Sequence, residues 1–174
     1  MLRSLLLALG LSLALVSCSA TLTLPLPDQT VEVAAVADTG GKVVYPAKPN
    51  PFSPPGSILK DVRVEGTLEA SQDLFLTLDL YARTKDPAQD PVCFALSDLG
   101  TTYAYVCSVG PEDEKIGQAG FANTKSAPLS LSGSKLTEGI KQGRLWLGVM
   151  ARGLPTAKVT FTFKNLRATV TLGF

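Results

Sequence analysis

The reactive side chains of this 174-residue chain are limited by its lack of histidine, which leaves three cysteines and 15 carboxylates as its main chemical groups. Without imidazole, Ser/His/Asp hydrolysis lacks its base, and the zinc, copper and non-haem iron sites that use histidine lack a ligand. A protein without these groups is better suited to binding or support than to catalysis. We therefore expect no enzyme activity, no metal and no cofactor.

Motifs that would restore a catalytic function are incomplete. Ser57 and Lys60 fit an S-x-x-K pattern, but the S-D-N and K-T-G tripeptides that this chemistry also needs are missing from the sequence. No G-x-S-x-G, G-x-G-x-x-G or Walker pattern occurs either. The carboxylates leave two alternatives open, a facing pair of glycosidase type and a calcium site, although surface solvation is favoured. The calcium candidates are two acidic groups: Asp86, Asp90 and Asp98, and Glu112, Asp113 and Glu114.

The N-terminal segment has the pattern of an export signal. Arg3 precedes an apolar run from Leu5 to Val16, which is too short to span a bilayer about 30 Å thick. The run ends in Leu15-Val16-Ser17-Cys18, which resembles the lipobox of bacterial lipoproteins. This resemblance implies a signal peptide at residues 1–17, lipidation of Cys18 as the new N-terminus by palmitate-type acyl chains, and a short tether at 18–20. An ordinary secreted protein and a buried N-terminal helix are the alternatives.

The charge balance changes once the signal peptide is removed. Loss of Arg3 from the 16 basic side chains leaves 15 against 15 acidic ones. A nearly neutral domain gives no support for binding nucleic acid, and no run of basic residues follows Cys18 to hold anionic lipid. We expect a protein held to a membrane by its lipid and facing away from the cytoplasm, on the outer membrane in a cell with two membranes. Its expected partner is an envelope protein or a surface polymer.

The two remaining cysteines, Cys93 and Cys107, flank a hairpin signal. Aromatic and β-branched runs surround a turn at Gly100, so positions equidistant from it should pair: 97 with 103, 95 with 105, and 93 with 107. The two cysteines would then face each other at disulfide distance in an oxidising compartment. A metal-binding or redox pair of thiols is the alternative, but the cysteines do not form a C-x-x-C motif.

Alternation of apolar and polar residues predicts strands along most of the chain. It is clear at 62–70 and 74–83, in two separate strands, and at 144–152, which is apolar on both faces. In the C-terminal run the apolar parity switches near Lys164 and Asn165, which predicts a bulge. Residues 110–126 are expected to form a long loop. The segment from Ser134 to Gly143 is expected to form one or two helical turns.

A segment rich in proline, residues 38–57, is expected to form an extended loop. Its Tyr45 and Phe52 are candidate partner-binding residues, with packing onto the domain as the alternative. Trp146, in the strand that is apolar on both faces, is the third candidate, because one of its faces could meet a partner. These three residues and Cys18 are the functional positions that the sequence suggests.

Together these patterns predict one all-β domain over residues 21–174, an antiparallel β-sandwich of jelly-roll or immunoglobulin-like kind, with a small β-barrel as the alternative. The predicted function is that of a non-catalytic lipoprotein of the cell envelope whose sandwich binds or supports another surface component. A second hypothesis is a module that binds carbohydrate or a small ligand, or a weak glycoside hydrolase based on carboxylates. It would use aromatic rings as a platform, from among Tyr81, Tyr103, Tyr105 and Trp146.

Overall fold

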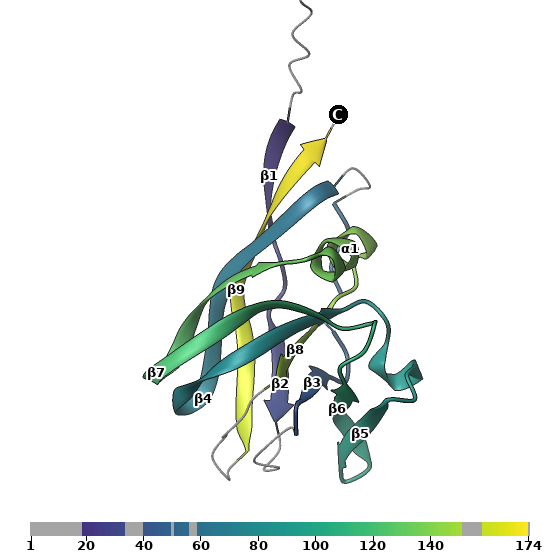
Figure 1. Ribbon diagram of the computed structural model, residues 1–174, viewed down its shortest axis with the longest axis vertical. Helices are drawn as coiled ribbons and strands as arrows, with labels where there is room; N and C mark the ends of the chain where they lie inside the picture. Colours follow the sequence, from purple (N-terminus) through teal and green to yellow (C-terminus); the bar gives the residue numbers. More distant parts are fainter. Residues whose placement is uncertain (1–18, 34–39, 50, 56–58, 151–157, 174) are drawn as a thin grey trace, which may run out of the picture.

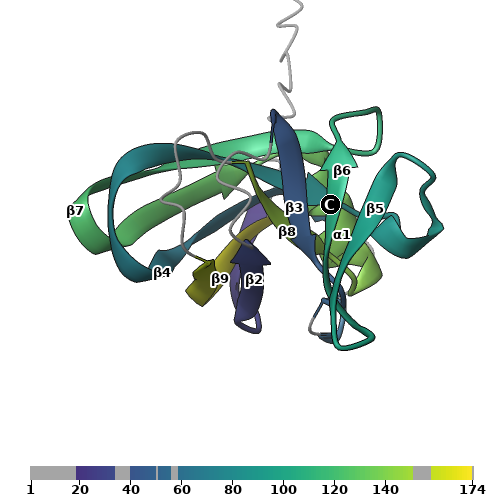
Figure 2. The same ribbon diagram turned by 90° about the horizontal axis from the view of Figure 1, so that it is seen from below.

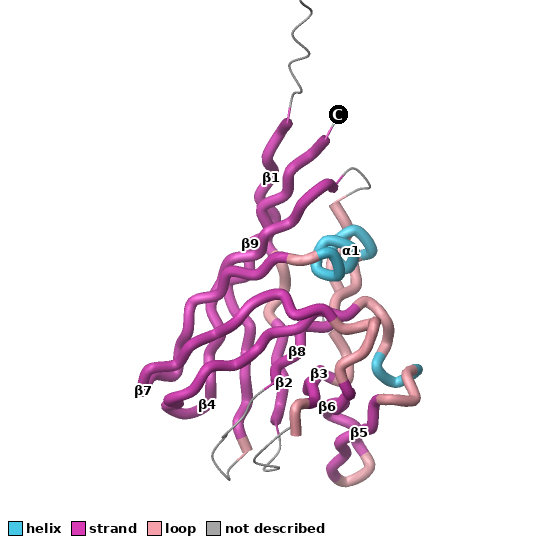
Figure 3. The backbone as a smooth tube through the Cα atoms, in the orientation of Figure 1, coloured by secondary structure: helices cyan, strands magenta, loops and turns pink. Residues whose placement is uncertain are grey.

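The computed structural model describes residues 19–33, 40–49, 51–55, 59–150 and 158–173. Its elements are mostly strands, joined by one short 3-10 helix and one α-helix (Figure 3). The strands are β1 (Ser19–Pro25), β2 (Gln29–Val33), β3 (Lys42–Pro46), β4 (Leu59–Arg83), β5 (Cys93–Asp98), β6 (Thr101–Ser108), β7 (Glu114–Ser132), β8 (Trp146–Met150) and β9 (Val159–Gly173), and the helices are η1 (Pro87–Gln89) and α1 (Ser134–Gln142).

In the described part of the chain, nine strands form one antiparallel sheet in the order β1-β9-β4-β8-β3-β6-β5, with β2 beside β9 and β7 beside β4. The sheet is not closed into a barrel and is sandwich-like. The prediction of an all-β antiparallel sandwich is therefore confirmed, and the barrel alternative is wrong.

The long strand β4 joins the two layers of this sheet, one with β9, β1 and β2 and the other with β8, β3, β6 and β5 (Figure 1). Its first half pairs with β9 and its last residues pair with β8, while β7 follows it along the other side. The register between β4 and β7 shifts between Glu69 and Leu74, and both strands curve over together (Figure 2). The sequence predicts two strands here because the alternation is interrupted at 71–73. The structure instead has one bent strand, since a bulge changes direction without ending the pairing.

A buried amide side chain links the two layers on the opposite side. Gln29 on β2 donates from Nε2 to the carbonyl oxygen of Leu145 at 3.1 Å and accepts from the Leu147 N–H at 3.2 Å. The side chain thus hydrogen-bonds to backbone groups of β8 and of the residue just before it, as the backbone of a neighbouring strand would. These two bonds satisfy a polar group that is only 4% exposed.

Two hydrophobic clusters stabilise the fold. The larger fills the space between the layers and includes Phe121 and Phe161, whose ring centroids lie 6.3 Å apart. The smaller lies on the other face of β3, β4, β6 and β8 and consists of Val43, Tyr45, Tyr81, Cys107, Trp146 and Met150. Gly148 allows this second cluster to pack closely, because a Cβ there would lie 2.5 Å from Cε1 of Tyr45. All five residues of β8 are buried, as its apolar pattern predicts.

Several local predictions can be compared directly with the structure. The helix and its left-handed cap at Gly143 are confirmed, with the Gly143 N–H directed to helix carbonyls. The bulge in β9 is also confirmed, because the register of β4 against β9 shifts opposite Lys164 and Asn165 has a φ of 54°. β1 begins at Ser19, so residues 19–20 of the predicted tether lie in a strand. Cys18 and the signal peptide lie outside the described residues.

Two predicted loops are wrong. Within the proline-rich segment 38–57, residues 42–46 form β3, an inner strand between β8 and β6. The run Lys-Val-Val-Tyr has high β propensity, and Pro46 is tolerated at the end of the strand. Likewise, most of residues 110–126 belong to β7, although this stretch is rich in glycine, glutamate and lysine. Pairing along β4 outweighs the weak intrinsic preference of these residues.

Candidate functional site

A buried arginine contacts polar side chains from several segments of the described chain. Arg83, the last residue of β4, has no exposed surface and forms an ion pair with Asp90, which follows η1. Its Nε lies 3.6 Å from Oδ1 of Asp113, a distance for charge attraction but too long for a hydrogen bond. Its Cζ also lies 5.6 Å from the centroid of the Tyr45 ring. Two carboxylates and one aromatic face therefore surround this cation.

The same guanidinium contacts the cysteine pair. Cys93 and Cys107 face each other in the β5–β6 hairpin, and their sulfur atoms lie at the bonded distance of 2.01 Å. Nη1 of Arg83 donates to both sulfur atoms, at 2.8 Å and 3.0 Å. The predicted register is confirmed at 93 with 107 and at 95 with 105. It is wrong at 97, which pairs with 102, because the register shifts after Leu96.

Both carboxylates of this centre have several hydrogen-bond donors. Asp113 accepts from the Tyr45 hydroxyl at 2.7 Å and from the Gly110 N–H at 2.8 Å. Asp90 accepts from the Val92 N–H at 3.2 Å. Burial alone would raise the pKa of the Asp90 carboxyl, but the Val92 N–H and the positive charge of Arg83 outweigh burial and lower it. The acids are thus engaged in structure and are not positioned as a free acid/base pair.

Burial explains why several sequence-based roles are corrected here. The expectation that Asp90 and Asp113 are solvated surface groups is wrong, because both side chains are buried beside Arg83. The neighbouring acid, Glu114, points to the start of α1. Its carboxylate accepts a hydrogen bond from the Lys135 N–H at 2.5 Å. Over the described ranges, no group of three or more Cys, Asp or Glu residues is arranged to hold a metal ion.

Two of the three candidate partner-binding residues are buried, and the third is partly buried. Tyr45 is fully buried and Trp146 is 3% exposed, both in the smaller hydrophobic cluster. Phe52 is partly buried and packs against the main core. Their prediction as binding residues is therefore corrected in favour of the packing alternative. A strand pattern alone does not show that Tyr45 and Trp146 belong to a second hydrophobic cluster, or that Phe52 packs against the core.

The exposed apolar residues instead gather on the hairpin that Arg83 supports. The large hydrophobic side chains that are exposed among the described residues are Leu22, Phe75, Val92, Phe94, Leu99 and Val109. Four of these six lie between residues 92 and 109. We call these four, Val92, Phe94, Leu99 and Val109, the hairpin surface. Sequence reasoning missed them, although Val92 and Phe94 stand out as apolar residues on either side of Cys93.

A small cavity opens at the base of the hairpin surface. It has a volume of about 230 Å³, and Val92 and Val109 line it together with Arg83, Lys85 and Glu112. Nearby, Nζ of Lys42 lies 4.9 Å from the centroid of the Phe94 ring. The arrangement offers an apolar side chain of a partner a recess with charged groups at its edge, a typical feature of binding sites.

Comparison with protein-family models, with curated proteins and with solved structures finds no match to this chain. Within the described ranges, no helix has the length and apolar character needed to cross a membrane. The class of protein defined by the fold is thus a β-sandwich-like domain, and the particular role must be argued from the geometry of its own sites.

Proposed function

We propose that this protein is a lipid-anchored, non-catalytic component of the bacterial cell envelope that binds a partner protein through the hairpin surface. The observation that carries the proposal is the gathering of four of the six exposed large apolar side chains on one disulfide-linked hairpin. Val92 and Val109 line one cavity, and exposed apolar residues around a recess are typical of interaction sites. The lipid anchor is supported by the resemblance of residues 15–18 to a lipobox.

Rigidity of the hairpin supports the proposal. The disulfide and the ion pair of Arg83 with Asp90 fix the base of β5. The helix η1, between Arg83 and Asp90, is capped by the Asp86 side chain, which accepts from the Ala88 N–H at 2.9 Å. A surface that is already ordered loses little conformational entropy on binding, which favours affinity.

The chemistry of the expected partner follows from the position of β5. This strand is the last of its branch of the sheet and has a strand neighbour, β6, on one side in the described chain. Between Cys93 and Asp98 it carries no lysine or proline, the residues that commonly protect such edges. β7, another outer strand, carries Lys115, Lys125 and Pro128. We therefore propose an extended, partly apolar segment of a partner protein that pairs with β5.

The carbohydrate hypothesis has less support from the aromatic residues. Trp146 and Tyr81 are buried, and Tyr103 and Tyr105 are half-buried against the hydrophobic clusters. A sugar platform needs exposed rings, and these rings contribute mainly to packing.

Crosslinking and capture of the lipidated protein from its native membrane tests the proposal. Phe94→Glu places a charge in the hairpin surface, whereas Phe75→Glu, at a residue that is 78% exposed on β4, is the matched control. We expect capture of the partner to fall about tenfold or more with Phe94→Glu and to remain with Phe75→Glu. Equal capture by both variants would contradict the proposal. So would turnover of a glycan that is lost when a carboxylate is substituted.

A further inference from the structure

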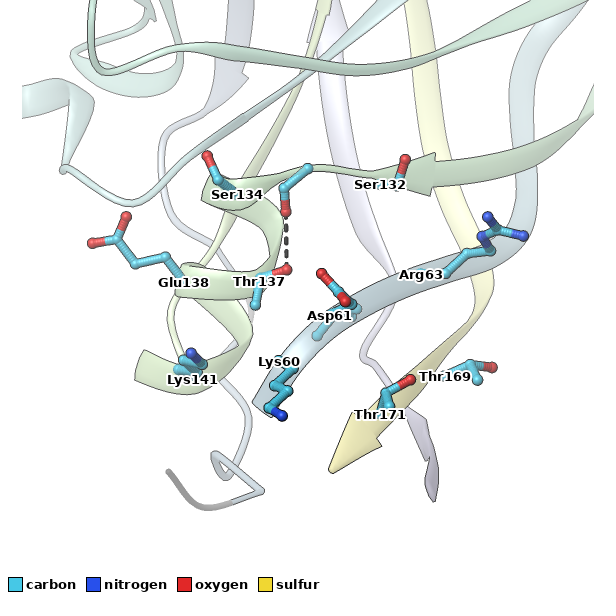
Figure 4. A pocket seen from close by; sticks show the side chains of 12 residues that line it. Lys60, Asp61, Arg63, Ser132, Ser134, Thr137, Glu138, Lys141, Thr169 and Thr171 are labelled. Atoms are coloured by element: carbon cyan, nitrogen blue, oxygen red, sulfur yellow. Dashed lines mark hydrogen bonds between the residues drawn. The ribbon is translucent and has the colours of Figure 1, made fainter. Parts of the chain in front are cut away.

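A second site lies at the other end of the molecule, in a polar groove between α1 and the outer face of the sheet (Figure 4). Its volume is about 910 Å³, and α1, β4, β7 and β9 supply its walls. The charged side chains in it are Lys60, Asp61, Arg63, Glu138 and Lys141, and hydroxyl groups come from Ser132, Thr169 and Thr171, among others.

The positive charges of this groove are available for a ligand. Lys60, Arg63 and Lys141 form no ion pair with any residue in the described ranges. Of the two carboxylates, Glu138 accepts from Gln142 at 3.0 Å and lies 3.8 Å from Nζ of Lys135. Three cationic side chains against the two carboxylates, Asp61 and Glu138, leave the groove with one positive charge in excess.

The start of α1 lines this groove through Gly133 and Ser134, but its Lys135 N–H is already bound to a carboxylate of the protein itself. Glu114 accepts from the Lys135 N–H at 2.5 Å and from the Ser134 hydroxyl at 3.1 Å. The groove therefore offers cationic and hydroxyl side chains, and it does not depend on the helix terminus.

The register of the strands places this groove beside the proposed anchor. Ser19 pairs with Gly173, and Leu59, the residue before Lys60, pairs with Leu172. Neighbouring strands are about 4.8 Å apart, so the backbone of Lys60 lies within roughly 10 Å of the start of β1. In Figure 1 the start of β1, the arrowhead of β9 and the start of β4 lie together, at the end opposite the β5–β6 hairpin. Since β1 is already formed at Ser19, the residue after Cys18, little flexible chain separates the groove from an acyl group there.

We propose that this groove binds the headgroups of anionic phospholipids in the membrane that carries the anchor. The proposal rests on the lipid attachment proposed above. Lys60, Arg63 and Lys141 supply the attraction for phosphate, and the hydroxyl groups supply further hydrogen-bond donors. The protein thereby holds one orientation, with the groove against the membrane and the hairpin surface directed away from it.

Amine acetylation of the lipidated protein, followed by mass spectrometry, tests the groove. The protein is placed in vesicles of neutral phospholipid and in vesicles with about 30% anionic phospholipid. We expect acetylation of Lys60 and Lys141 to be about fivefold slower in the anionic vesicles, while Lys125 at the bend of β7 reacts equally in both. Arg63→Glu should remove the protection of Lys60, whereas Lys125→Glu, the matched control, should not.

The outcomes distinguish failure of the groove proposal from failure of the anchor proposal. Equal acetylation of Lys60 in both vesicles, with acyl chains present on Cys18, would overturn the groove alone. Equal protection by inorganic phosphate in neutral vesicles would overturn the assignment to lipid. If mass spectrometry shows an unmodified chain that still begins at Met1, the anchor and the orientation derived from it both fail.

Discussion

Arg83 carries a full charge inside the protein, and its neighbours determine whether that charge stabilises the fold. The cost of removing a guanidinium from water is several kcal/mol, and it is offset only where opposite charges and hydrogen-bond acceptors surround the group. Asp90, Asp113 and the two sulfur atoms of the disulfide provide them. Through these contacts, Arg83 at the end of β4 holds the β5–β6 hairpin against that strand.

Replacing Arg83 with methionine should destabilise the protein by roughly 3–5 kcal/mol, because the carboxylates would remain buried without their cation. The matched control is Lys85→Met. This side chain is 42% exposed and its Nζ lies 4.0 Å from Asp90, so we expect a change of about 1 kcal/mol or less. Urea unfolding of both variants measures the difference. A similar loss in the two variants would show that burial of Arg83 has no special role.

The environment of Tyr45 predicts that the free energy of unfolding falls at alkaline pH. Burial raises the pKa of its phenol well above the ordinary value of 10.0, and the Asp113 carboxylate raises it further. The unfolded chain releases this proton from about pH 10 upward while the folded chain retains it, so unfolding becomes easier as pH rises above 10. Below that pH the contribution is fully present.

The expected slope is about 1.4 kcal/mol per pH unit for this one proton, between about pH 10 and the raised pKa. Tyr45→Phe should make the decline shallower by that amount, as measured by urea unfolding at a series of pH values. Part of the decline should remain, because burial and then Asp79 also raise the pKa of Tyr81. An unchanged slope in the variant would contradict the assignment to Tyr45.

At the level of elements, local pattern predicts what depends on neighbouring residues. The turn at Gly100, where φ is 80°, and the apolar runs around it were enough to predict the hairpin, but Cys93 lies opposite Cys107 only because the register shifts between Leu96 and Ser97. The change of inward face in β9 could also be predicted, because apolar parity reports directly on burial. Whether residues 110–126 form a strand depends instead on the length of β4, with which they pair. The composition of these residues does not indicate that pairing.

The candidate sites were harder to predict for the same reason. Arg83 has the parity of Asp79 and Tyr81, which suggests an outward position, whereas in the structure it is buried beside Asp90 and Asp113 from later segments of the chain. In the groove, Lys60 and Arg63 are distant in sequence from Lys141, so no basic run is visible. Tertiary packing creates both sites.

The disulfide should contribute about 3 kcal/mol of stability, because it closes a loop of about 15 residues in the unfolded chain. Cys93→Ala with Cys107→Ala should therefore lower the free energy of unfolding by at least this amount, as Arg83 also loses two acceptors. The matched control is the neighbouring cross-strand pair Ser97→Ala with Thr102→Ala, whose hydroxyl oxygens lie 3.0 Å apart. That change should cost about 1 kcal/mol or less. Equal losses, measured by urea unfolding, would contradict the prediction.

At the scale of the whole molecule, the two proposed sites lie at opposite ends of the described fold. β1 and the groove lie at one end, and the hairpin surface lies at the other (Figure 1). β4 and β7 run together over most of the distance between them, and Gln29 links the two layers across the open side. The proposed membrane contact at the first end would therefore determine where the hairpin surface is presented.

This geometry predicts that a flexible insertion should uncouple the two ends without unfolding the domain. A Gly/Ser linker of about 12 residues between Cys18 and Ser19 spans about 17–21 Å, enough to let the groove leave the membrane. In anionic vesicles the linker variant should remain anchored, while Lys60 is acetylated faster and with a reduced dependence on anionic lipid. An insertion of the same length beside Gly100, in the β5–β6 turn, controls for the effect of added chain and should leave Lys60 protected. If Lys60 stays equally protected in the linker variant, the groove binds the membrane strongly enough by itself, and the orientation does not depend on the short connection to Cys18.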